Sequence, residues 1–153
     1  MKVILDTNEY IFGLDKESGN EDSLKLLDVV RLLLNEVDDF RLLVPEIIRK
    51  EVQRNIPNDF ESDFYRFIYS NKKIKHHSVT DIPMKLFKKY HKDRGLKEGD
   101  ALIAAFAEFT GIDYIISENR HIYKDTKINE FVTMNAGEFL DLIEKNLQNK
   151  GGA

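Results

Sequence analysis

The first eight residues, Met1 to Asn8, constrain the fold more than any other part of this chain. Residues 3–5 form a short apolar run that ends abruptly in the carboxylate of Asp6. Such a run is typical of a buried strand in a parallel sheet, and open α/β sheets bind ligands at the carboxyl ends of their strands. A charge at the edge of a core is costly unless it is paired, hydrogen-bonded or bound to a metal. Asp6 is therefore a candidate functional residue, although residues 6–8 also suit a simple turn.

Signals for strands and helices alternate along the rest of the chain, which predicts a parallel sheet built from βα units. Besides the N-terminal strand, the sequence predicts strands at 40–44, 74–79, 113–117 and 131–132, the second of these as a short strand or an extended link. Helices are predicted at 24–37, 46–55, 59–70, 83–92, 97–110 and 136–147. Asp22 or Ser23 is the expected cap of the first helix, and Gly111 the stop of the fifth. We expect one α/β domain over residues 1–148, followed by a frayed tail at 149–153.

The composition narrows the function classes. The chain has no cysteine, so neither disulfides nor thiolate metal sites contribute. No apolar run is long enough to cross a bilayer, and the first residues lack the basic segment and cleavage site of a signal peptide. We therefore expect a cytoplasmic protein without a membrane partner.

Charge is distributed unevenly along the chain. The net charge is −4 overall, yet residues 71–97 contain nine Lys and Arg against two Asp, which makes this tract +7 and the remainder −11. The nine are Lys72, Lys73, Lys75, Lys85, Lys88, Lys89, Lys92, Arg94 and Lys97. A basic tract in an acidic protein suits a polyanionic partner such as RNA. The alternative is a solvated helix face of lysines.

Further polar residues fall at places equivalent to that of Asp6. Glu51 lies in the helix after the second strand, Asp100 in the first turn of the helix at 97–110, and residues 117–119 follow the strand that contains Tyr114. Strand ends and helix starts share one edge of a parallel sheet, so these groups can converge on one pocket. Clustered carboxylates repel unless a cation neutralises them, and hard oxygen ligands favour Mg²⁺ or Mn²⁺.

Each member also has an ordinary explanation. Asp100 suits the helix dipole, and Glu51 could be a surface residue near Arg54. Asn119 could form a turn, and Glu118 could be solvated. Their joint placement at strand ends is what favours a shared site.

The chain resembles the PIN domain family of nucleases, which includes the toxins of VapBC-type modules. The resemblance covers roughly residues 2–122 and rests on four motifs in the family's order: Ile4-Leu5-Asp6-Thr7-Asn8, Val44-Pro45 followed by Glu51-Val52, Gly99-Asp100-Ala101-Leu102-Ile103-Ala104-Ala105, and Ile115-Ile116-Ser117-Glu118-Asn119-Arg120-His121. Each motif is short, whereas their ordered combination is fairly specific.

The resemblance implies a three-layer α/β/α sandwich and an endoribonuclease that uses Mg²⁺ or Mn²⁺. It implies Asp6, Glu51 and Asp100 as acidic metal-binding and catalytic positions. Asn119 stands where many members carry a fourth Asp and others an Asn, which puts a second metal in doubt, although Glu118 could partly substitute.

Other residues are candidates for contacts with the substrate. Thr7, Asn8 and Ser117 can position a phosphate or a water through polar groups, and Arg120 can contact phosphates, as can His121 unless it is an ordinary surface histidine. From the basic tract, the candidates are Lys72, Lys73, Lys88 and Lys89. His76 and His77 are a poor metal pair, because neighbours in an extended segment point to opposite faces.

Two rival functions remain. A catalytically weak PIN-like domain would bind RNA or a partner through the basic tract, but such a surface has no need of converging carboxylates. A haloacid dehalogenase-type phosphotransferase also uses an Asp after the first strand, but it normally has a second acid at the position of Asn8.

Association is also expected. The helix around residues 24–34 is apolar over most of its circumference, whereas a helix resting on a sheet needs only about a 100° apolar face. The surplus can be covered by the helices within 46–70, by a second copy or by a small antitoxin. The family resemblance favours a homodimer or an antitoxin complex.

Overall fold

A computed structural model describes residues 1–17, 20–119 and 130–151 of the chain. Its centre is a five-stranded sheet with the order β3-β2-β1-β4-β5, in which every neighbouring pair is parallel. The strands are β1 (Lys2–Leu5), β2 (Arg41–Pro45), β3 (Ile74–His77), β4 (Tyr114–Ile116) and β5 (Val132–Met134). The predicted parallel sheet is confirmed, and residues 74–77 form a true strand at its edge.

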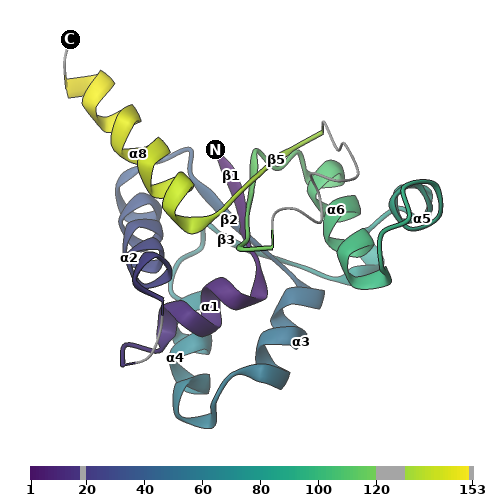
Figure 1. Cartoon of the computed structure of the whole chain (residues 1–153), viewed down its shortest axis with the longest axis horizontal. Coiled ribbons are helices and arrows are strands. Elements are labelled where there is room, and N and C mark those ends of the chain that lie inside the picture. The colour runs from purple at the N-terminus through teal and green to yellow at the C-terminus, as the bar shows by residue number, and fades with distance from the viewer. Residues whose placement is uncertain (18–19, 120–129, 152–153) are drawn as a thin grey trace.

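Helices cover both faces of this sheet (Figure 1). They are α1 (Thr7–Leu14), α2 (Glu21–Glu36), α3 (Glu46–Asn55), α4 (Asn58–Ile68), α5 (Met84–Lys88), α6 (Glu98–Thr110) and α8 (Ala136–Gly151). In Figure 1, α2 and α8 pack together on one side, and α6 lies on the other with α5 outside it. Helix α3 lies between the two layers, in contact with α1 and α6. The predicted three-layer α/β/α arrangement is confirmed.

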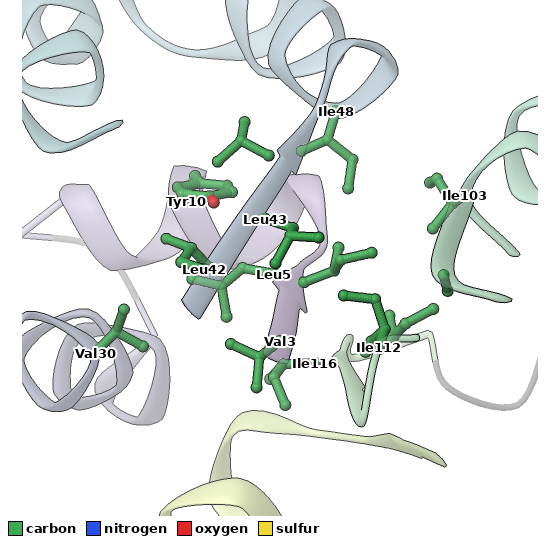
Figure 2. Packing of buried hydrophobic residues seen from close by; sticks show 14 of the residues in the cluster. Val3, Leu5, Tyr10, Val30, Leu42, Leu43, Ile48, Ile103, Ile112 and Ile116 are labelled. Atoms are coloured by element: carbon green, nitrogen blue, oxygen red, sulfur yellow. The ribbon is translucent and has the colours of Figure 1, made fainter. Parts of the chain in front are cut away.

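The core follows from strands that are apolar on both sides. Val3, Ile4 and Leu5 are completely buried, and Leu42 of β2 is buried beside them (Figure 2). A strand covered by helices on both faces needs apolar residues throughout, which explains why the N-terminal run shows no alternation. Among the described residues, no helix is long and apolar enough to cross a membrane.

The first helix was not predicted. Helix α1 begins directly after β1, with Asp6 as its cap, so the polar loop after β1 starts only at Asp15. Helix α2 is capped by Asn20, whose side chain accepts from the amides of Asp22 and Ser23, the two residues expected to be the cap. The cap therefore lies two residues earlier than predicted.

Three other helix ends refine the prediction. Gly111 closes α6 with a φ of 68°, as expected from its lack of a side chain. The helix predicted at 83–92 is α5 followed by a π-helical turn, η2 (Lys89–Asp93), and a 3₁₀ turn, η1 (Val79–Asp81), precedes it. Helix α8 continues to Gly151, so it includes the first residues of the expected frayed tail.

The apolar circumference of α2 is covered within the chain. Leu26 and Val30 are completely buried, and α2 packs against α1 and α8. Helices α1 and α8 therefore cover most of the apolar surface of α2 that does not face the sheet, a role for which the sequence had suggested the helices at 46–70. Leu32 remains 56% exposed.

A glycine sets how closely α1 approaches α2. A Cβ added at Gly13 would lie 2.7 Å from the side chain of Leu27 and 2.8 Å from the carbonyl oxygen of Ser23. Real Cβ atoms do not approach other atoms so closely, so the two helices can be this near only with glycine at this position.

Candidate active site

Asp6 lies at the carboxyl end of β1, between the ends of its neighbours. Its amide donates to the carbonyl of Ile116 in β4 at 2.9 Å. Its carboxylate accepts from the amide of Thr7 at Oδ1 (2.8 Å) and from the hydroxyl of Ser117 at Oδ2 (2.7 Å). The half-buried carboxylate is therefore fixed in orientation by groups from two strand ends.

Glu51 is brought to the same place by α3. The hydroxyl of Thr7 donates to its Oε2 at 2.7 Å. Its Oε1 lies 3.6 Å from where a Cβ of Gly99 would be, so this carboxylate faces the first turn of α6. Thr7 thus joins the start of α1, just after β1, to the middle of α3, and Glu51 reaches toward the helix that carries Asp100.

Asp100 lies in the first turn of α6 and is half-buried. Burial raises the pKa of its carboxyl, and the negative charge of Asp6 raises it further, whereas Lys97 acts in the opposite direction. Asp6 and Asp100 therefore repel each other across one site. A cation placed between them would relieve this repulsion.

Residues 117–119 form the turn after β4. Ser117 is buried, and its hydroxyl accepts from the amide of Asn119 at 3.1 Å while it donates to Asp6. Asn119 is exposed beside this turn. Glu118 accepts at Oε1 from the amide of Ala136 at 3.2 Å, so it also stabilises the start of α8.

Glu9, which was not predicted to be part of the site, is completely buried beside it. The hydroxyl of Ser23 donates to its Oε2 at 2.8 Å. No group among the described residues donates to its Oε1, and the carboxyl of Glu118 is its neighbour. Burial first, and then the hydrogen bond and charge of Glu118, raise the pKa of Glu9 to about 8, against a smaller opposing effect of Ser23. Glu9 therefore holds a proton at neutral pH and can donate it to Glu118.

The pattern of buried residues in α1 could have indicated that Glu9 is buried. Tyr10 and Leu14 are buried and lie on that face, as does Glu9. Without a predicted helix after Asp6, nothing distinguished Glu9 from a solvated residue.

The metal-binding capacity of the site follows from its donor atoms. Within 1–17, 20–119 and 130–151, no three acidic or histidine side chains already lie close enough together to hold a metal ion. The hydroxyls of Thr7 and Ser117 bind two of the carboxylates instead. Three carboxylates and an amide oxygen are nevertheless the hard donors that Mg²⁺ and Mn²⁺ prefer. The donor set fits such an ion.

The other residues predicted to contact the substrate differ in how exposed they are. Asn8 is half-buried in the first turn of α1. Lys72 and Lys88 are exposed. Arg120 and His121 lie outside the described residues.

Two lysines of the basic tract have partners within the chain. Lys73 donates to the carbonyl of Val37 at 2.9 Å. Lys89 is paired with Glu108 and Glu130 at 2.8 Å each, and both carboxylates raise its pKa against the opposing effect of burial. The positive charge available to a ligand is therefore smaller than the sequence suggests.

Comparison with known proteins agrees with this geometry. The PIN domain family model matches residues 3–127, which include Asp6, Glu51, Asp100 and Asn119. The chain belongs to the PIN domain family. PIN domains are generally nucleases and typically use divalent metals. No curated protein sequence matches the chain significantly.

A solved structure supports the fold of this PIN domain. One chain in the crystal structure of VapBC2 from Rickettsia felis, bound to a DNA fragment from their promoter, superposes with a TM-score of 0.57. The alignment covers 88% of this chain and 98% of that chain, at 16% sequence identity. At this identity the likeness supports the fold alone.

Proposed function

We propose that this PIN domain is a divalent-metal-dependent endoribonuclease that hydrolyses RNA phosphodiester bonds. The observation that carries the proposal is the convergence of Asp6, Glu51 and Asp100 at one edge of the sheet, with Asp6 and Asp100 close enough for one charge to raise the pKa of the other carboxyl. A surface that only binds anions has no use for three converging carboxylates. This is the argument against a catalytically weak binding domain.

The proposed roles follow from the contacts. Asp6, Glu51, Asp100 and Asn119 would hold one or two Mg²⁺ or Mn²⁺ ions. Such an ion, when bound, lowers the pKa of a water and stabilises charge on the leaving oxygen. Thr7 and Ser117 orient the carboxylates of Glu51 and Asp6 through their hydroxyls, and Asn8 is the proposed contact for a phosphate.

The toxin of a toxin–antitoxin pair is the biological role that we favour. The structural neighbour belongs to a VapBC2 complex, and a small antitoxin is the corresponding partner for this chain. A homodimer is the second proposed assembly. Leu32, exposed on α2, is the first residue to substitute in testing either contact.

Dependence on the metal tests the proposed activity directly. Mixed cellular RNA should be cleaved in the presence of Mn²⁺ or Mg²⁺, and excess EDTA should abolish cleavage, because the carboxylates alone provide no Lewis acid. Gel electrophoresis of the RNA measures both. Undiminished cleavage in EDTA would contradict the proposal.

The exposed lysines should determine the salt dependence of RNA binding. Replacing Lys72, Lys85 and Lys88 by Gln should weaken binding to RNA of any sequence, and should lower the slope of log K against log salt by about 0.7 for each lost phosphate contact. Filter binding over a range of salt concentrations measures this slope. Lys89→Gln is the matched control, because its ammonium is already paired. A triple variant with the wild-type slope would leave these lysines as solvated surface charges.

A further inference from the structure

Three aromatic side chains form a stack on the outside of the molecule, away from the acidic residues. The ring of Tyr65 in α4 and the ring of Tyr69, the residue directly after α4, are nearly parallel at a centroid distance of 6.4 Å. The ring of Tyr69 stacks in turn on that of His76 in β3, at 4.8 Å and an interplanar angle of 18°. Tyr69 is 64% exposed, which is unusual for a large aromatic residue.

The stack is held from both ends. Gln53 of α3 donates to the hydroxyl of Tyr65. His76 donates from Nε2 to the carbonyl of Ile68 at 2.9 Å, because a carbonyl oxygen can only accept. Rings fixed in this way lose little conformational freedom when a ligand stacks on them.

A hollow of about 450 Å³ opens beside the stack, lined in part by Tyr69, His76 and Arg49. Arg49 is half-buried, and no acidic side chain in the described part of the chain pairs with it. Glu46, the acid in the same hollow, is already bound by Lys50 at 3.1 Å and by the amide of Val79 at 2.8 Å. The guanidinium of Arg49 therefore remains available to an anion.

We propose that this hollow binds an unpaired base of single-stranded RNA, stacked on the outer face of His76, whose other face packs against Tyr69, with a neighbouring phosphate on Arg49. Aromatic faces accept any base, and arginine is suited to phosphate, so the two together fit a nucleotide. Lys72 and Lys75, exposed just before and within β3, add positive charge to the same edge of the sheet.

The hollow is a second contact for the substrate, on the far side of α3 from the acidic site. His77 pairs with Pro45 at the carboxyl end of the sheet, the edge where Asp6 also lies. Arg49 and Glu51 are two residues apart on α3, which places them about 200° apart around the helix. The inference rests on the proposed function for the identity of the ligand. It adds that the enzyme anchors unpaired nucleotides at some distance from the bond that is cleaved.

Binding measured without cleavage tests the anchor. Fluorescence anisotropy of a labelled, unstructured oligoribonucleotide is measured in EDTA with the full chain. Tyr69→Ala should weaken binding about tenfold or more, which is within the range of stacking contributions, because His76 loses the ring that holds it in place. Tyr69→Phe should keep wild-type affinity because the ring remains. Arg49→Gln should lower the salt slope by about 0.7. A fully paired RNA should compete poorly, since its bases are not free to stack.

Each outcome decides between the alternatives. Wild-type affinity in a folded Tyr69→Ala variant, with folding verified by circular dichroism, would overturn the anchor, as would the absence of RNA binding by the wild type. Equal competition by paired RNA would also overturn the anchor. Displacement of the RNA only by an aromatic or proline-rich peptide would overturn it as well and would indicate a protein ligand instead. If the wild type binds RNA through Tyr69 but cleaves none with Mg²⁺ or Mn²⁺, the nuclease proposal fails and the anchor stands.

Discussion

Replacing Asp6 or Asp100 by Asn is expected to reduce metal-dependent RNA cleavage by about a hundredfold or more. Substitution of residues that only orient a metal ligand typically costs 10–100-fold, and removal of a ligand carboxylate should cost at least as much. Initial rates on a fixed RNA, at saturating Mn²⁺, measure the effect. The fold should survive, because loss of one of two repelling charges relieves the repulsion described by the raised pKa of Asp100.

Two further variants make this result specific. Asp59→Asn, on the exposed surface of α4, should retain full activity. Ser117→Ala should lose about 10–100-fold, because Asp6 keeps its charge but loses the hydroxyl that orients it. Full activity in both Asp6→Asn and Asp100→Asn would exclude the acidic residues from catalysis.

Glu9→Gln is expected to make the protein markedly more stable at alkaline pH. The pKa of Glu9 rises from an ordinary value of 4.5 to about 8 on folding, chiefly through burial. Below pH 4.5 the carboxyl is protonated in both the folded and the unfolded state, so burial has no charge to penalise. Between pH 4.5 and about 8 the unfolded state releases its proton while the folded state keeps it, so the wild type loses stability through this range, and the loss levels off above it. Each pKa unit corresponds to about 1.4 kcal/mol, so the loss is on the order of a few kcal/mol.

Thermal unfolding at pH 5 and pH 9 measures this difference. Gln should resemble the protonated Glu, since its amide can donate to Glu118 while its oxygen accepts from Ser23. The variant should therefore match the wild type at pH 5 and unfold at a higher temperature at pH 9. Glu17→Gln, at an exposed position, is the matched control. A gain in stability that is equal at both pH values would mean that Glu9 does not hold its proton.

The sequence was sufficient for the features that depend on local pattern and on sheet geometry. Apolar runs located the strands, and the rule that parallel strands end at one edge predicted Asp6, Glu51 and Asp100 on the same side of the molecule. Their role as metal ligands stays a prediction. Helix α1 was missed because Asp6 is followed by residues that suit a turn as well as a helix start. Glu9 was missed for the same reason.

Contacts between residues that are separated in the sequence could not be predicted from local pattern and sheet geometry. Lys89 pairs with Glu130, 41 residues later, and Tyr69 stacks on His76 across a turn. A count of charges or aromatic residues reveals neither. The basic tract therefore resembled one uniform surface in the sequence, whereas in the structure Lys73 and Lys89 have partners within the chain. Arg49, outside the tract, has no acidic partner among the residues that the structure describes.

The contact at Gly13 links the distance between α1 and α2 to the positions of side chains in the candidate site. Helix α1 starts at Asp6, in the candidate site, and its other end, at Gly13, packs directly against α2. Any side chain at position 13 would push this end outward, and tilting an eight-residue helix displaces Thr7 and with it the hydroxyl that orients Glu51. The distance between two helices, set by a residue outside the candidate site, therefore controls where the hydroxyl of Thr7 lies without any change to the carboxylates themselves.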